Sequence, residues 1–197
     1  MGKSTSLLSA FYKPYLYSFY QRKYMTFKSK NYLFLAIVLF NVIFDQVTKQ
    51  LAKRLLEQNF IYTYFFDILR LIYVENSGVA YSFGADWAPH YKFIVFNLIV
   101  TAIVAALIIY VYKMMNELSP MRLIGFSLIV TGGVGNLIDR YLRDGHVIDF
   151  LNIGLGGIRT AIFNWADFCI STGIVMLFIY ALTELRSKPK TETETEI

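Results

Sequence analysis

Four aspartates lie at or near the ends of apolar segments, where a charged side chain is energetically unfavourable. Asp45, Asp139 and Asp167 lie at the ends of long apolar segments, and Asp149 follows closely after one of them. A charge inside a bilayer costs about 2.5–3.5 kcal/mol even on lenient insertion scales, so each carboxylate needs a partner or a role. Asp149 and Asp167 have no cation at helical spacing. Two such carboxylates brought together would not both ionise, which is the arrangement of an aspartic protease: one activates water and its protonated partner polarises the scissile carbonyl.

A structural interpretation of the other charges is equally open at this point. Asp45 and Lys49 are spaced i, i+4, and Asp139 is followed directly by Arg140, so we expect two ion pairs that fix helix packing. Arg143 and Arg159 could still reach Asp149 or Asp167 through the fold. We interpret Arg143 and Asp144 as loop charges in water.

Polar residues and glycines near these aspartates follow helical spacing. Asn136, Asp139 and Arg140 share one helix face at i, i+3 and i+4, and Asn164 precedes Asp167 by three residues. Three glycines come just before them and would allow close approach of another helix: Gly132, Gly133 and Gly135.

The elements that must position these residues are membrane-spanning helices. The chain of 197 residues is 56% hydrophobic and only 17% charged, well below the charged share of soluble domains. Because about 20 helical residues cross a bilayer, we expect four spans, at about residues 32–51, 93–112, 123–141 and 162–182. The net charge of +5 comes from basic residues that flank apolar segments, which argues against nucleic-acid binding.

Orientation follows from the basic residues of the short connections. Lysines and arginines gather before the first span, between the second and third, and after the fourth, so both termini are expected in the cytoplasm. Asp45, Asp139 and Asp167 then meet at the outer boundary. Residues 1–30 lack the pattern of a cleavable signal peptide and are expected to form a cytoplasmic extension, with Met25 as an alternative start. Residues 31–184 would form the membrane domain, and 185–197 a disordered tail.

About 40 residues separate the first two expected spans. Residues 68–84 are rich in β-branched and aromatic types and are interrupted by "NSG", which predicts short strands or a hairpin. Residues 146–151 predict another short strand that ends at the flexible "GLGG". The predicted fold class is therefore an all-α polytopic membrane protein with four transmembrane helices and a small extracytoplasmic β-sheet element.

Other functions fit the sequence less well. A serine–lysine protease would use Ser77 or Ser82 with Lys49 as base, but "NSG" is more typical of a turn. Cys169, the single cysteine, is expected to be a small packing residue and not a nucleophile. A proton-coupled transporter would place its carboxylates near the midplane at a repeat interface, and a purely structural assembly factor would leave Asp149 and Asp167 without a role. With one cysteine and two distant histidines, we expect neither a metal centre nor a cofactor.

Five motifs in order resemble those of the lipoprotein signal peptidase (signal peptidase II) family: "DQVTK" (45–49), "ENSGVAYSF" (75–83), "GGVGNLIDR" (132–140), "HVIDF" (146–150) and "FNWAD" (163–167). The resemblance covers the whole membrane core. It implies four helices, cytoplasmic termini and a small outer β-sheet.

The resemblance also implies an activity and a set of site residues. The family is an aspartyl endopeptidase that cuts prolipoproteins before the diacylglyceryl-modified cysteine. Matched by motif, the catalytic pair is Asp149 and Asp167. The remaining matched positions would support and line the site: Asp45, Lys49, Asn76, Gly78, Asn136, Asp139, Arg140, Asn164 and Ala166. The expected partners are modified prolipoproteins and membrane lipid, and the expected state is a monomer in the bacterial cytoplasmic (inner) membrane with its site at the outer leaflet.

Overall fold

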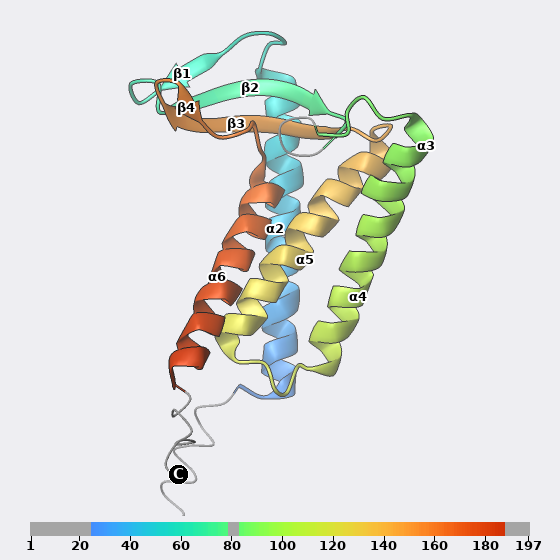
Figure 1. The fold of residues 1–197 in the computed structure, drawn as a ribbon, viewed down its shortest axis with the longest axis vertical. Helices are drawn as coiled ribbons and strands as arrows, with labels where there is room; N and C mark the ends of the chain where they lie inside the picture. Colours follow the sequence, from blue (N-terminus) through green and yellow to red (C-terminus); the bar gives the residue numbers. More distant parts are fainter. Residues whose placement is uncertain (1–24, 79–82, 188–197) are drawn as a thin grey trace, which may run out of the picture.

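The computed structural model describes residues 25–78 and 83–187 of the chain. Four long helical segments stand side by side, and a four-stranded sheet lies across one end of them (Figure 1). Each segment is long and apolar enough to cross a membrane: Phe27–Leu55, Pro89–Lys113, Pro120–Leu142 and Trp165–Leu185. The predicted fold, four membrane helices with a small β-sheet, is confirmed.

The first span is helix α2 (Phe27–Leu55), which begins earlier than the sequence suggested. The Thr26 hydroxyl accepts a hydrogen bond from the Ser29 backbone N–H at 3.2 Å and caps the helix. Lys30 is buried, and its ammonium donates to three backbone carbonyls in the connection between the second and third spans, at 3.0, 2.9 and 2.7 Å: those of Met115, Asn116 and Leu118. Lys30 therefore ties the start of α2 to that connection.

The second span contains three helical segments in succession: α3 (Pro89–Lys92), the π-helical segment η2 (Phe93–Ile99) and α4 (Val100–Lys113). The proline at the first helical position has no N–H to leave unpaired. Each π turn adds one residue to the helical repeat and so changes which side chains face inward. Such turns are rare and often occur at functional sites.

The third span, α5 (Pro120–Leu142), is the central helix and packs against the other three, among them α6 (Trp165–Ser187). Its glycines permit this. A Cβ on Gly132 would lie 2.2 Å from the Ala166 carbonyl oxygen, and one on Gly135 would lie 2.7 Å from Asp45 Oδ2. The close helix approach predicted from these glycines is confirmed.

The sheet contains β1 (Tyr62–Tyr64), β2 (Leu69–Asn76), β3 (Val147–Leu155) and β4 (Ile158–Arg159), antiparallel and in that order. The short strands or hairpin expected in 68–84 are present as one strand, β2, whose hairpin partner is the earlier strand β1; residues 79–82 lie outside the described residues. Strand β3 runs four residues beyond the predicted end at 151 and stops at the turn around Gly156, where φ is +54°.

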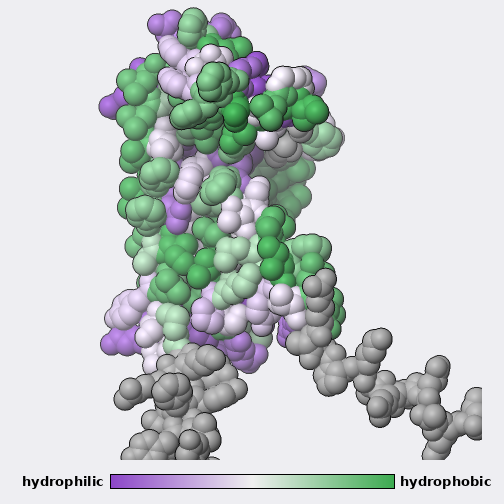
Figure 2. All heavy atoms as spheres, turned by 90° about the vertical axis from the view of Figure 1, so that its left-hand side faces the viewer, coloured by the Kyte–Doolittle hydropathy of each residue, from purple (hydrophilic) through white to green (hydrophobic). Residues whose placement is uncertain are grey.

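The interior changes character along the bundle. The apolar core at the end away from the sheet contains Phe34, Val111, Met115, Leu118, Leu123 and Val130. Near the sheet the buried side chains include charged groups, among them Asp45, Lys49 and Asp139, with 0% exposure each. Figure 2 shows a largely hydrophobic surface along the helices, with hydrophilic residues gathered mainly toward the two ends. The bundle is therefore apolar outside, where lipid would contact it, and polar inside beneath the sheet.

Candidate active site

Asp149 lies on β3, directly opposite Val74 of β2, and is only 4% exposed. Its two carboxylate oxygens accept hydrogen bonds from two side-chain amides. The Asn164 amide donates to Oδ1 at 2.7 Å, and the Asn76 amide donates to Oδ2 at 2.9 Å. The strand therefore presents a carboxylate whose position is fixed from both sides.

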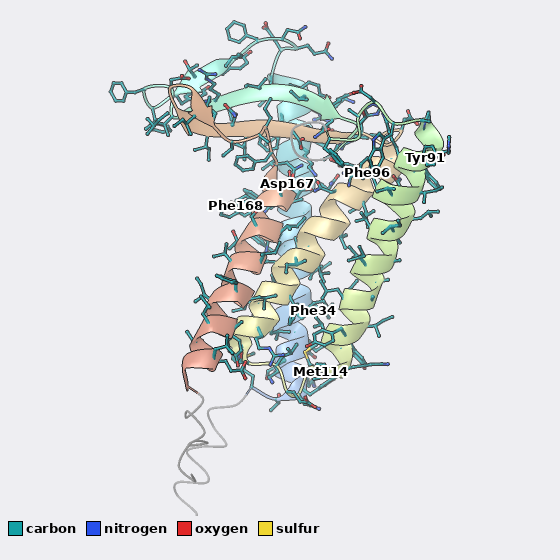
Figure 3. The ribbon with its side chains drawn as sticks, in the orientation of Figure 1. Phe34, Tyr91, Phe96, Met114, Asp167 and Phe168 are labelled. Carbon is teal, nitrogen blue, oxygen red and sulfur yellow. The ribbon has the colours of Figure 1, made fainter. Side chains whose placement is uncertain are left out.

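Asp167 lies in the first turn of α6, beneath the sheet (Figure 3). Its backbone N–H donates to Asn164 Oδ1 at 3.0 Å, and its own Oδ2 accepts from the Asn164 backbone N–H at 3.1 Å. This reciprocal pair is a capping box, which satisfies two helix N-terminal donors and orients the carboxylate. The other oxygen, Oδ1, accepts from the Asn136 amide at 2.8 Å.

One continuous amide network joins the two aspartates. The Asn164 amide, which donates to Asp149, also lies 3.2 Å from Asn136 Oδ1, and Asn136 in turn donates to Asp167. Both aspartates line one cavity of about 610 Å³, called here the aspartate cavity. Asp149 and Asp167, which have no cation at helical spacing, therefore line the same cavity.

Burial is the main cause of a shift at Asp149. Its removal from water, and next the charge of Asp167, raise the pKa of Asp149 to about 6. The amides of Asn76 and Asn164 and the charge of Lys49 act in the opposite direction and limit the rise. Near neutral pH this carboxyl can exist in either protonation state, which suits a group that exchanges protons during a reaction.

A buried ion cluster supports the site from behind. Lys49 Nζ lies 2.8 Å from Asp45 Oδ2 and 3.0 Å from Asp139 Oδ2, and none of the three side chains is exposed. The same ammonium donates to Asn136 Oδ1 at 3.0 Å, which connects the cluster to the amide network. The expected Asp45–Lys49 pair is confirmed.

The cluster also links three helices and the sheet through backbone groups. Asp45 Oδ1 accepts from the Ala166 N–H at 2.9 Å, one residue before Asp167. Asp139 Oδ2 accepts from the Ile148 N–H at 3.2 Å, one residue before Asp149. Each carboxylate of the cluster therefore holds the backbone beside one aspartate of the cavity.

The expected pairing of Asp139 with Arg140 is wrong. Asp139 pairs with Lys49 and also with Arg143, whose Nη1 lies 3.1 Å from Asp139 Oδ1. Arg143 is accordingly not a loop charge in water, because its side chain is only 16% exposed. Asp144 is exposed, as expected.

Arg140 points into the aspartate cavity instead. Its Nη2 donates to the Gly78 carbonyl at 3.2 Å, and the Gly78 N–H donates to Asn76 Oδ1 at 2.9 Å. Arg140 thus supports the turn that holds Asn76 against Asp149. All eleven residues matched by motif lie in the aspartate cavity, in the amide network or in the ion cluster behind it.

Two residues that contact the ion cluster, Gln46 and Arg143, were not predicted from the sequence to belong to it. The Gln46 amide lies 3.1 Å from each of Asp45 Oδ2, the Gly135 carbonyl and Asp139 Oδ1. Its only sequence signal was its place beside Asp45. Arg143 had a clearer signal, since it follows Asp139 at i+4.

The rival nucleophiles are placed differently. Ser77 Oγ accepts from Lys92 at 3.2 Å, while Lys49 is bonded within the ion cluster. Ser82 lies outside the described residues. Cys169 is 1% exposed, packed with its sulfur 3.7 Å from Asn41 Oδ1, in keeping with a packing role. Across residues 25–78 and 83–187, no group of three or more His, Cys, Asp or Glu side chains could hold a metal ion.

Comparisons with known proteins agree on one family. The family model described as "Signal peptidase (SPase) II" matches residues 37–183. The chain is similar to the lipoprotein signal peptidases of Borrelia turicatae, at 34% identity over 77% of this chain and 89% of that protein, and of Borreliella burgdorferi strain ZS7, at 35% over 79% and 94%.

A solved structure described as a bacterial membrane enzyme has the same fold. It matches with a TM-score of 0.69 and 29% identity, over 83% of this chain and 94% of that one. The family match covers every aspartate of the cavity and of the cluster behind it. It also covers the second and third spans completely, the first span from residue 37 and the fourth as far as residue 183. The chain is therefore a multi-pass bacterial membrane peptidase that belongs to the signal peptidase II family.

Proposed function

We propose that the protein is an aspartic endopeptidase that removes signal peptides from prolipoproteins, cutting before the diacylglyceryl-modified cysteine. Asp149 and Asp167 are its catalytic pair. The observation that supports this most directly is the shared cavity: two carboxylates from different elements, tied by one amide network, at the edge of the membrane bundle. The relatives are named lipoprotein signal peptidases, which supports the choice of substrate.

The proposed chemistry uses a single proton shared by the pair. The ionised carboxylate removes a proton from a water molecule, whose oxygen attacks the scissile carbonyl carbon. The protonated carboxyl donates to the carbonyl oxygen as negative charge develops there. When the C–N bond breaks, the leaving nitrogen takes up the proton that the pair had removed from water, the C=O bond re-forms, and the pair returns to its single proton. Because the two groups titrate together, the proton belongs to the pair.

Charge balance supports one retained proton. Arg140 is the cation of the cavity, and a pair with one proton has a charge of −1. The Lys49 ammonium is already balanced within its own cluster with Asp45, Asp139 and Arg143. A doubly ionised pair would leave one unbalanced negative charge in a largely buried site, which is costly.

The other site residues act by positioning. Asn76, Asn136 and Asn164 hold the two carboxylates, and Gly78 with Arg140 holds Asn76. Asp45, Lys49, Asp139 and Ala166 fix the backbones from which the pair projects. The remaining, mostly apolar part of the aspartate cavity would take the lipid and signal-peptide side of the substrate.

We also propose the orientation. Lys28 and Lys30 of α2, Lys113 of α4 and Arg122 of α5 lie at the end of the bundle away from the sheet, which by the positive-inside rule is cytoplasmic. Both termini then lie in the cytoplasm and the site at the outer leaflet. The extension predicted at 1–30 would be shorter, because α2 begins at Phe27, and the tail predicted at 185–197 would follow α6, which ends at Ser187. The residues between would form the peptidase domain, and the enzyme would act as a monomer. A reporter fused after Lys190 should be active only inside the cell, and one at Ala85 only outside. The reverse pattern would overturn the orientation.

Product mapping tests the activity. The purified protein in lipid vesicles is given one prolipoprotein in two forms, with and without the diacylglyceryl group on its cysteine. We expect mass spectrometry to find a mature product that begins with the modified cysteine, and little product from the unmodified form. Equal cleavage of both forms, or a cut elsewhere, would refute the proposed specificity.

A further inference from the structure

A second cavity lies next to the aspartate cavity, and its lining includes neither Asp149 nor Asp167. It has a volume of about 520 Å³ and is called here the Lys92 cavity. It lies between the start of the second span, the end of α5 and the turn that leads into β3. The residues that matter here are Ser77, Lys92, Asn97, Arg140, Asp144 and His146.

One buried polar atom at this cavity, on Arg140, lacks a partner in the described part of the chain, and a mostly buried asparagine lines the cavity beside it. The Asn97 side chain is 4% exposed and lines the cavity, and no described residue hydrogen-bonds to its amide. Asn97 belongs to the π-helical segment η2, whose irregular turns direct it inward. Arg140 is 7% exposed, and its Nε likewise has no partner among the described residues. Buried polar groups are rarely left unpaired, so a polar ligand is expected to complete them.

The two cavities meet at Arg140. This side chain lines both of them, and its guanidinium carbon lies 5.7 Å from the centre of the Phe96 ring. Figure 3 places Asp167 and Phe96 at the same level beneath the sheet. The residues at the end of β2 and in the turn after it are distributed between the two cavities. Asn76 and Gly78 line the aspartate cavity, whereas Ser77 lines the Lys92 cavity. A polypeptide cut at the aspartates could therefore pass Arg140 and continue into the second cavity.

The two cavities have different linings, and this difference indicates which side of a substrate each cavity would bind. Away from the aspartates, the first cavity is lined by apolar side chains such as Ile162, Phe163 and Ile170, which suit acyl chains and an apolar signal peptide. The Lys92 cavity instead offers donors from Lys92, Asn97 and Arg140 and acceptors from Asn97 and Asp144. A polypeptide backbone presents both donors and acceptors, whereas a phosphate headgroup presents acceptors alone and would meet the Asp144 carboxylate.

We propose that the Lys92 cavity binds the first residues of the mature chain, those that follow the modified cysteine. The proposal rests on the proposed peptidase function. Asn97 and Arg140 bind the backbone, and Lys92, a half-buried residue of the lining, favours acidic side chains over basic ones at these positions. The cavity is thus a specificity site for the residues that leave the membrane with the product.

The test is a charge exchange between enzyme and substrate. Two diacylglyceryl-modified prolipoproteins are compared that differ only in the two residues after the cysteine, Asp-Asp or Lys-Lys. For the wild-type enzyme in lipid vesicles we expect kcat/KM to be about fivefold higher for the acidic substrate, as for a partly exposed ion pair. Lys92→Glu should reverse that preference, mainly through KM. Lys113→Glu, at the far end of the same span, is the matched control and should keep the wild-type preference.

A second variant tests the backbone contact. Asn97→Leu keeps the number and branching of the side-chain heavy atoms but cannot hydrogen-bond, so it should raise KM several-fold for both substrates and leave kcat and thermal stability near wild type. The idea fails if Lys92→Glu changes kcat/KM equally for both substrates or not at all. It also fails if Asn97→Leu leaves KM unchanged. Failure of the peptidase proposal would look different, because Asp149→Asn and Asp167→Asn would then still cleave both substrates.

Discussion

Lys49 and Asp139 form an ion pair at 3.0 Å across two helices, with no exposed side-chain surface on either residue. Because the same ammonium also bonds Asp45 and Asn136, one cation holds together the helices that position both aspartates of the site. This pair is structural in the proposed mechanism.

Removal of Lys49 is predicted to destabilise the fold strongly. Lys49→Ala would leave Asp45 and Asp139 as buried carboxylates with too little compensating charge, at a cost of about 3–5 kcal/mol. Thermal unfolding in detergent should show a large fall in Tm. Lys53→Ala is the control, because Lys53 and Glu75 are 3.8 Å apart and about half exposed. It should cost less than about 1 kcal/mol. Equal effects of the two substitutions would contradict this role of Lys49.

The contact between α5 and α6 is predicted to tolerate no side chain at Gly132. A Cβ there would lie 2.2 Å from the Ala166 carbonyl oxygen, beside Asp167, so Gly132→Ala must push the helices apart. We expect a loss of roughly 1–3 kcal/mol, the range for overpacking, together with reduced cleavage. Gly157→Ala, where nothing lies within 4 Å of the added carbon, should be close to neutral by the same assays. A wild-type Tm for Gly132→Ala would count against the packing described here.

The raised pKa of Asp149 predicts a stability that falls as pH rises. Between about 4, the ordinary value, and about 6, the folded protein binds more protons at this site than the unfolded chain does. Asp149 therefore destabilises the fold above that window, by an amount on the order of 2–3 kcal/mol. Asp149→Asn removes this effect. Its Tm should exceed that of the wild type at pH 8, and the difference should shrink toward pH 4. A difference that is constant across this range would show that the group does not titrate there.

The start of α2 predicts which part of the N-terminus matters. A chain that starts at Met25 keeps the Thr26 cap and Lys30, so it should insert and cleave like the full chain. Lys30→Ala loses three hydrogen bonds to carbonyls, two of them buried and one partly buried, and should cost about 2–3 kcal/mol. Lys28→Ala, on the exposed side of the same turn, is the control. Loss of cleavage in an inserted Met25 chain would give the first 24 residues a role of their own.

Much of the site could be predicted from spacing and motif order, and the predictions that were wrong failed for physical reasons. Asn164 and Asp167 at i, i+3 do form one unit, as a capping box. The supposed Asp139–Arg140 pair failed because adjacent helical residues point about 100° apart, whereas Arg143 at i+4 shares the face of Asp139. Contacts between helices, such as Lys49 with Asp139, depend on packing that one sequence does not reveal.

The sheet and the second cavity were harder to foresee. The strand at "HVIDF" was visible, but its continuation to Leu155 depends on pairing with β2 and β4. Asn97 looked like an isolated polar residue in an apolar span. Its burial at the Lys92 cavity depends on the π-helical turns of η2, for which no signal is recognisable in the sequence.

The most direct test of the central claim is a double-mutant cycle at the aspartates. Rates of cleavage of a diacylglyceryl-modified prolipoprotein are measured for Asp149→Asn, Asp167→Asn and the double variant, each shown to be folded and inserted. If the two carboxylates work as one proton-sharing pair, each single substitution should lower the rate by several orders of magnitude. The double variant should be hardly slower than either, because residues that act as a unit are not additive. A near-normal rate for either single variant, or losses that simply multiply, would contradict the account.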